Sequence, residues 1–271
     1  MDLVDKRILF ALLKDARTPQ RQIASSIGIS AQTLNYRMGK MLEEGIIKNF
    51  VVMESPFLTG KVEGFAAFVS DREFSGKPRT RIKCLEKITL YGFEGENEAD
   101  VNVQISKAAE ELGNPVMKYF PKFISYNQNS RAIDREIINQ LRKDPRANLS
   151  DIAKQINAPL MRVKWRYNIM KKNNLLNVTV KVDLSKTDVV LFSIFCGYNE
   201  NIRKTLLEST IFSITDAKYG VFICFTENMV KAKDIINKVR TMEEASEVMV
   251  IYDYDFFPDE HLLCEYHFLI S

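Results

Sequence analysis

The spacing of apolar residues predicts three helices and a strand at the start of the chain. Apolar side chains recur every three or four positions, which is the period of a helix with one buried face. Ser30 is a favoured N-cap for the third helix, and Leu34, Met38 and Met41 form its inward face. The predicted elements are helices over about 3–14, 18–27 and 30–44 and a strand over 46–53.

The same pattern returns 129 positions later without a gap. The run VDKRILFALLKDARTPQRQIASSIGIS, which begins at position 4, aligns with IDREIINQLRKDPRANLSDIAKQINAP, which begins at position 133. At two aligned helix ends a glycine is replaced by an asparagine, Gly28 by Asn157 and Gly45 by Asn174. Both residue types tolerate the left-handed backbone that often follows a helix. The repeat therefore predicts a second set of three helices and a strand, folded like the first.

A different pattern follows each set of helices. Apolar, strand-like runs occur at 62–69 and 189–196. In the second half the order is strand, helix, two strands, helix, strand, which is the βαββαβ order of ferredoxin-like domains. Its later elements are a helix over about 200–208, strands over 210–215 and 219–226, a helix over 228–241 and a strand over 247–254. The first half has a shorter version, with a helix near 79–87, strands near 88–94 and 100–105, a helix near 106–112 and a strand near 119–126.

These patterns predict an α+β chain of two tandem repeats, each a winged helix-turn-helix followed by a ferredoxin-like βαββαβ domain. The winged motif is expected because three helices and a β wing fall within some fifty residues. The expected domains are winged helix-turn-helix 1 (1–60), a shortened ferredoxin-like effector or dimerisation domain (61–129), winged helix-turn-helix 2 (130–182) and a second ferredoxin-like effector or dimerisation domain (183–271).

The composition is that of a folded chain of several small domains, with 46% hydrophobic and 27% charged residues among 271. No run of eighteen apolar residues occurs, so we expect no membrane span. The start MDLVDKRILF is amphipathic and acidic, unlike a signal peptide, so we expect a cytoplasmic location. Cys84, Cys196, Cys224 and Cys264 follow no CxxC spacing and are expected to be reduced, mostly buried thiols.

Basic residues concentrate in the two sets of helices. Residues 1–50 carry eight Lys/Arg against five Asp/Glu, and residues 131–182 carry twelve against four, although the whole chain has a net charge of only +3. Two basic segments in an otherwise acidic chain indicate contact with a polyanion.

The first 52 residues resemble the DNA-binding domain of a known family. The runs DKRILFALLKDART, QIASSIGIS and RMGKMLEEGIIKNF look like the leucine-responsive regulatory protein/AsnC family, and DAKYGVFICFTEN (216–228) is similar to that family's second domain. The resemblance implies a transcription regulator that joins a winged helix-turn-helix to a βαββαβ domain, which binds small effectors and forms dimers and octamers. Family members normally carry one such unit, and the duplication here suggests an archaeal regulator. The Gly-rich effector loops of the family are not evident.

The outward face of each third helix supplies the candidate DNA contacts, because that helix enters the major groove. Gln and Asn can pair with adenine, and Arg with guanine or phosphate. The candidates are Gln32, Thr33, Asn35, Tyr36 and Arg37 in the first unit and Arg162, Lys164, Trp165 and Arg166 in the second. Lys48 and Lys181, at the predicted wings, are expected to contact phosphates. The two helices share an aligned arginine and differ at most other positions, so we expect them to read different half-sites.

Trp165 is the only tryptophan of the chain. The helical phase places it outside the inward stripe of Val163, Tyr167 and Met170, between Lys164 and another basic residue. It is expected either to contact DNA or to pack against the following wing.

No P-loop, GxGxxG, HExxH or GxSxG motif occurs, so we expect neither an enzyme nor a cofactor. His261 and His267 bracket Cys264, but these three residues lack the fourth ligand of a zinc site, and we expect no metal. Two alternatives stay open. Siroheme decarboxylases resemble the same family and need basic and histidine side chains around a tetrapyrrole, and a non-specific architectural protein would coat DNA without a defined site.

The expected partners are double-stranded DNA and a second copy of the chain. The apolar runs VEGFAAFV and VVLFSIFC need covered faces, and any open strand edge invites pairing. The two small domains could pair within one chain or between chains, and we favour a homodimer carrying four helix-turn-helix units. A small-molecule effector is a further partner implied by the family resemblance.

Overall fold

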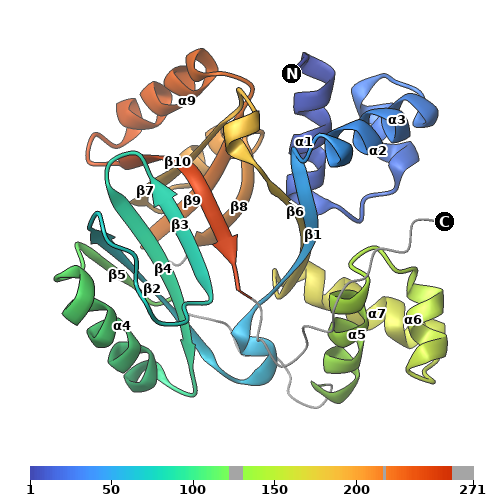
Figure 1. The fold of residues 1–271 in the computed structure, drawn as a ribbon, viewed down its shortest axis with the longest axis horizontal. Helices are drawn as coiled ribbons and strands as arrows, with labels where there is room; N and C mark the ends of the chain where they lie inside the picture. The colour runs from blue at the N-terminus through green and yellow to red at the C-terminus, as the bar shows by residue number, and fades with distance from the viewer. Residues whose placement is uncertain (122–130, 216–217, 258–271) are drawn as a thin grey trace.

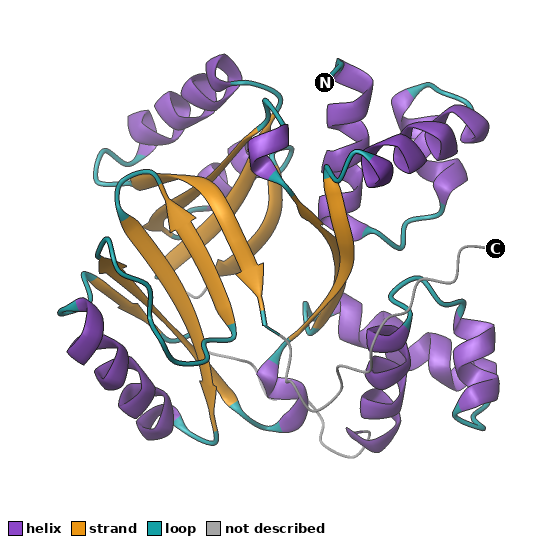
Figure 2. Cartoon of the chain, in the orientation of Figure 1, coloured by secondary structure: helices purple, strands orange, loops and turns teal. Residues whose placement is uncertain are grey.

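A computed structural model of the chain describes residues 1–121, 131–215 and 218–257. A large curved antiparallel sheet lies beside two clusters of three helices (Figures 1 and 2). Within the described ranges, no helix is long and apolar enough to cross a membrane. Cys84, Cys196 and Cys224 are buried, as expected, whereas Cys264 lies outside these ranges.

The first helix cluster forms where the apolar spacing predicts it. Ser30 caps its third helix by accepting a hydrogen bond from the Thr33 N–H, and Leu34, Met38 and Met41 are buried beneath that helix. Its elements are α1 (Leu3–Asp15), α2 (Gln20–Ile27) and α3 (Ala31–Glu43), followed by strand β1 (Ile47–Glu54). The second cluster comprises α5 (Arg131–Lys143), α6 (Leu149–Gln155) and α7 (Leu160–Lys172), followed by β6 (Leu176–Val182).

The glycine-to-asparagine exchanges fall at left-handed backbone positions, as predicted. Gly28 and Gly45 have φ values of +81° and +68°, and the aligned Asn157 and Asn174 have +49° and +54°. Each of the four residues lies just after a helix, where a β-branched side chain would be strained. The two clusters therefore end their helices by the same device.

Strands β1 and β6 pair antiparallel with each other in a two-stranded sheet, here called the ribbon. This corrects the expected wings, because each strand pairs with the other half of the chain and not with a neighbour in its own unit. The register is symmetric under the repeat. Phe50 faces Val180, and shifting both residues by 129 in opposite directions gives Thr179 facing Val51, which is also a pair of the ribbon.

The ribbon also completes the two helical cores. Val178 and Val180 of β6 are buried in the core of the first cluster, next to α1. Conversely, Leu58, in the 3-10 turn Pro56–Thr59 after β1, is buried in the core of the second cluster. Each helix cluster therefore depends on a segment from the other half of the chain.

The large sheet has eight strands in the order β5-β2-β4-β3-β10-β7-β9-β8. Two four-stranded halves meet where β3 pairs antiparallel with β10, so β5 and β8 are the outer edges. Helix α4 packs on the first half, and α8 and α9 pack on the second. The first half comprises β2 (Val62–Val69), β3 (Thr80–Cys84), β4 (Ile88–Gly95), α4 (Glu98–Leu112) and β5 (Met117–Tyr119). The second comprises the 3-10 turn Leu184–Lys186, β7 (Val190–Gly197), α8 (Glu200–Leu206), β8 (Thr210–Thr215), β9 (Tyr219–Thr226), α9 (Met229–Met242) and β10 (Glu247–Phe256).

The second half follows the predicted βαββαβ order closely, but the first half departs from its prediction. The predicted helix over 79–87 is strand β3, in which polar and apolar residues alternate through TRIKC. The predicted strand over 100–105 belongs to helix α4, which begins at an Asn97 cap and buries Val101, Ile105 and Ala108. Within its described residues, the first half therefore has one helix where a full ferredoxin-like domain has two.

Candidate nucleic-acid interface

Helix α3 presents three of its candidate residues to solvent. Gln32, Asn35 and Tyr36 are exposed, and Tyr36 has 73% of its surface free. Thr33 is half-buried, and its hydroxyl lies 2.8 Å from that of the capping residue Ser30. Exposed amides such as these can pair with adenine, and an exposed aromatic ring lies on the same helix face.

Helix α7 presents a more basic surface. Arg162, Lys164 and Trp165 are exposed, and 58% of the Trp165 surface is free. Its inward stripe is as predicted, since Val163 and Tyr167 are buried, as is Met170. The outward residues of α3 and α7 therefore differ in kind, neutral amides on one and cations with a large ring on the other.

The aligned arginines do not face outward, which corrects the sequence prediction for both. Arg166 is only 4% exposed and forms a buried ion pair with Asp134 of α5. Arg37 occupies the matching place, half-buried, and binds Asp5 of α1 at 2.8 Å and Asp2 at 2.6 Å. The hydrogen bonds that Arg37 donates to these two carboxylates raise the pKa of Arg37. Both arginines therefore attach the third helix to the first helix of their own cluster.

The two lysines of the ribbon have different environments. Lys48 on β1 is exposed and lies 3.4 Å from Asp183, so it remains free to move toward a phosphate. Lys181 on β6 is buried, contrary to the prediction, and binds Asp253 at 3.2 Å and Asp255 at 3.1 Å. Its ammonium also lies 4.3 Å from the centre of the Tyr254 ring. Lys181 therefore connects the ribbon to strand β10.

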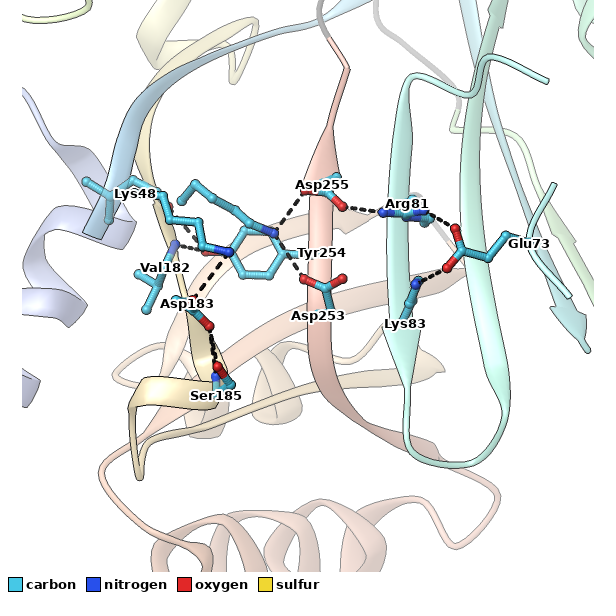
Figure 3. A network of polar contacts seen from close by, with 12 residues as sticks. Lys48, Glu73, Arg81, Lys83, Val182, Asp183, Ser185, Asp253, Tyr254 and Asp255 are labelled. Carbon is cyan, nitrogen blue, oxygen red and sulfur yellow. Dashed lines mark hydrogen bonds and ion pairs between the residues drawn. The ribbon is translucent and has the colours of Figure 1, made fainter. Parts of the chain in front are cut away.

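A network of polar contacts continues across the sheet from β10 (Figure 3). Asp255 accepts a hydrogen bond from Arg81 of β3 at 2.6 Å, and Glu73 binds both Arg81 and Lys83. Burial opposes ionisation of Asp255, but the hydrogen bonds from Arg81 and Lys181 hold its pKa below the usual range. This network joins the two halves of the sheet at the β3–β10 junction. Through Lys181 it also attaches the ribbon to β10.

Much of the positive charge of residues 131–182 is used inside the molecule. Arg142 pairs with Glu54 of β1, and Lys171 pairs with Asp15 of α1. The Arg146 guanidinium lies 5.0 Å from the centre of the Phe50 ring, and burial lowers the pKa of Arg146. A basic surplus in the sequence is therefore not an equal surplus on the surface.

Arg17 is a structural residue to which the sequence assigned no role. Its guanidinium donates hydrogen bonds to the carbonyl oxygens of Pro145 and Ala147 at 2.8 and 2.7 Å. It also lies 5.3 Å from the centre of the Tyr167 ring. These partners are backbone groups and a ring of the opposite cluster, which no local sequence signal identifies. The contact holds the two helix clusters together.

The histidine and cysteine cluster at 261–267 lies outside the described residues. In the part of the chain that the structure describes, no group of three or more His, Cys, Asp and Glu side chains could hold a metal ion.

Comparisons with known proteins agree with this arrangement of helices. A family model described as "Winged helix-turn-helix DNA-binding" matches twice, over residues 1–48 and 130–176. The HTH-type transcriptional regulator FL11 of Pyrococcus furiosus is 29% identical over 42% of this chain and 76% of its own length. The regulator PF0250 of the same organism is 31% identical over 44% of this chain and 81% of its own length.

Regulatory protein AsnC of Haemophilus influenzae is 43% identical over 20% of this chain and 35% of its own length. Among solved structures, the siroheme decarboxylase NirDL is 12% identical, with a TM-score of 0.46 over 93% of this chain and 91% of its own. The family match in both helix clusters and the identity to regulators over up to 81% of their length agree with the exposed third helices. The chain is a DNA-binding transcription regulator and belongs to the leucine-responsive regulatory protein/AsnC family.

Proposed function

We propose that this regulator is sequence-specific and places two unlike recognition helices, α3 and α7, on one DNA duplex. The observation that carries the proposal is that aligned helices present different exposed residues, Gln32 and Asn35 on one and Arg162 and Lys164 on the other. Amides read adenine and arginine reads guanine, so the two half-sites differ.

The proposed DNA contacts are narrower than the set expected from sequence. They are Gln32, Thr33, Asn35 and Tyr36 on α3, Arg162, Lys164 and Trp165 on α7, and Lys48 on β1. Arg37, Arg166 and Lys181 are removed from the set because their cations are bound to carboxylates of the protein itself. Their proposed role is to hold the reading helices and the ribbon in place.

We further propose that the chain is a tandem duplication with domains at 1–60, 61–129, 130–182 and 183–271. The shared left-handed positions and the symmetric register of the ribbon support this, as do regulators that each match less than half of the chain. The ribbon would then stand in for contacts that two single-unit chains make with each other.

Three further expectations remain part of the proposal. A homodimer with four helix-turn-helix units would form at the open edges of the large sheet, β5 and β8. A small-molecule effector would modulate DNA binding, as the family resemblance implies. The protein would act in the cytoplasm, where its DNA target lies.

Selection of bound sequences from a random DNA pool, followed by footprinting, tests the proposed specificity. We expect two unlike half-sites whose centres lie about one helical turn apart, or a multiple of it. The double variant Gln32→Ala/Asn35→Ala should relax one half-site, and Arg162→Ala/Lys164→Ala the other. Diffuse protection without a selected sequence would instead support an architectural role and overturn the proposal.

A further inference from the structure

A cavity of about 1390 Å³ lies between the large sheet and the second helix cluster. Strands of both sheet halves line it, including the outer strands β5 and β8, and helix α7 and the end of β1 complete its wall. Pockets of about 300–1,000 Å³ hold drug-sized molecules, so this cavity can accept a ligand of several rings.

The wall of the cavity is largely apolar. Phe65 of β2, Leu191 of β7, Phe212 of β8 and Ile223 of β9 line it from the sheet, and Trp165 lines it from α7. A ligand that fills this space must therefore present a mostly hydrocarbon surface.

Glu63 of β2 also lines the cavity. It is the carboxylate that we expect to determine which charge a ligand must carry. It forms no ion pair or hydrogen bond with any residue that the structure describes. Burial raises the pKa of Glu63 to about 7, with Arg79 opposing and Glu94 adding to that effect. Arg79 and Lys61 each bind Glu94, and no ion pair between Glu63 and a cation is found among the described residues.

A second carboxylate at the cavity, that of Glu54, is paired with Arg142 through Oε1 only. Glu54 lines the cavity at the end of β1, and its Oε2 is buried without a hydrogen-bond partner among the described residues. The cations of the lining are ion-paired or otherwise partnered, since Arg79 binds Glu94, Arg81 binds Asp255 and Glu73, Arg166 binds Asp134, and Lys77 has a partner too. Nε of Arg81 is one buried donor that makes no hydrogen bond among the described residues. The Glu63 carboxylate has no cation of its own, whereas the charged groups around it are ion-paired, and this favours a ligand that brings positive charge to Glu63.

We propose that this cavity binds an apolar organic cation, a molecule with a hydrocarbon body of two or more rings and one ammonium-type charge, held at Glu63. The hydrocarbon body contacts the sheet and Trp165, and the charge lies beside the carboxylate. That the ligand would act as an effector rests on the proposed function, because α7 forms one wall of the cavity. That the cavity binds the ligand does not depend on the proposed function.

A matched pair of fluorescent probes tests the site in the absence of DNA. Diphenylhexatriene is neutral, its trimethylammonium derivative carries one positive charge, and both brighten in apolar surroundings. The cationic probe should bind the full chain at least tenfold more tightly than the neutral one. Because Trp165 is the only tryptophan and lines the cavity, energy transfer from it to the bound probe reports the location.

Glu63→Gln should abolish the preference for the cationic probe and leave binding of the neutral probe unchanged. Glu96→Gln, at an exposed position after β4, is the matched control and should keep the preference. Affinity of the native chain for the cationic probe should rise about tenfold from pH 6 to pH 8, as Glu63 ionises. Equal affinity for both probes, a preference that survives Glu63→Gln, or bound probe without quenching of Trp165 would each overturn the proposal.

Discussion

Arg166 and Asp134 form a buried ion pair with two parallel hydrogen bonds between α7, a proposed recognition helix, and α5, the first helix of its cluster. Nε of Arg166 donates to Oδ1 at 2.7 Å and Nη2 donates to Oδ2 at 2.5 Å. Asp134 is 1% exposed, so its charge has little access to water. This planar, two-bond geometry fixes the orientation of α7 as well as its distance from α5.

Replacing Arg166 with Ala should destabilise the protein by about 3–5 kcal/mol, because it leaves the Asp134 carboxylate buried without a partner. Arg37→Ala, whose ion pairs are half-exposed, should cost about 1 kcal/mol or less. Urea denaturation measures both. Specific DNA affinity of the folded Arg166→Ala fraction should stay within a few-fold of the native value, and a large loss there would return Arg166 to the DNA contacts.

Arg162→Ala/Lys164→Ala should lower the slope of log K against log salt for DNA binding by about 2, since each phosphate contact contributes roughly 0.9. Both side chains are exposed, so the urea midpoint should barely change. Lys233→Ala, at an exposed position of α9, is the control and should leave the slope unchanged. An unchanged slope in the double variant would contradict the placement of α7 on DNA.

Alanine at the left-handed positions should destabilise both helix clusters. Alanine tolerates the left-handed backbone less well than glycine or asparagine, so Gly45→Ala and Asn174→Ala, at φ values of +68° and +54°, should each cost about 1 kcal/mol. Gly39→Ala, within α3 and with open space around an added Cβ, should have the opposite sign and stabilise by up to about 1 kcal/mol. Denaturation midpoints compare the three, and equal signs would show that the backbone relaxes at these turns.

The raised pKa of Glu63 predicts a pH-dependent stability. Its pKa is about 7 in the folded protein against 4.5 ordinarily, so between these values the folded state binds more protons than the unfolded state. Stability should therefore fall as pH rises from 4.5 to 7, by roughly 3 kcal/mol for this group. Glu63→Gln should remove that fall, so that the variant is more stable than the native chain at pH 8 and similar at pH 4. Parallel pH profiles for the two proteins would contradict the burial of Glu63.

The outer strands of the large sheet, β5 and β8, are the proposed sites of self-association. Sedimentation at micromolar concentration should give about twice the chain mass of 31.2 kDa. Because β8 would pair with a second copy, a proline at Ile214, within β8, should shift the species toward the monomer mass. A monomer mass for the native chain would remove the homodimer from the proposal.

Local features of the fold could be predicted from the sequence, and distant partnerships could not. The left-handed backbone at Asn157 follows from residue type and from alignment with a glycine. The inward stripe of α7 follows from helical period. Arg166 was misplaced because it lies at the edge of that stripe, where a cation is buried only if a carboxylate meets it. A signal did exist, since Asp5 and Asp134 align just as the two arginines do.

The pairing of β1 with β6 and of β3 with β10 could not be predicted from the sequence, for a physical reason. Pairing of β1 with β6 joins residues some 130 positions apart, and an apolar strand accepts many partners of similar pattern. The burial of Lys181 depends on that pairing, because Asp253 and Asp255 come from a third segment. The charge surplus of residues 131–182 likewise gave no view of which cations the fold uses internally.

Because the ribbon joins the two helix clusters within one chain, α3 and α7 stay together however dilute the protein is. Two separate chains joined by the same strands would dissociate as their concentration fell and could exchange subunits with related regulators. Here one polypeptide carries both strands, so their effective concentration is set by the chain itself. Every molecule therefore keeps one α3 and one α7 at a fixed stoichiometry, so that, if these helices read DNA as proposed, their base preferences could diverge without either helix losing its partner.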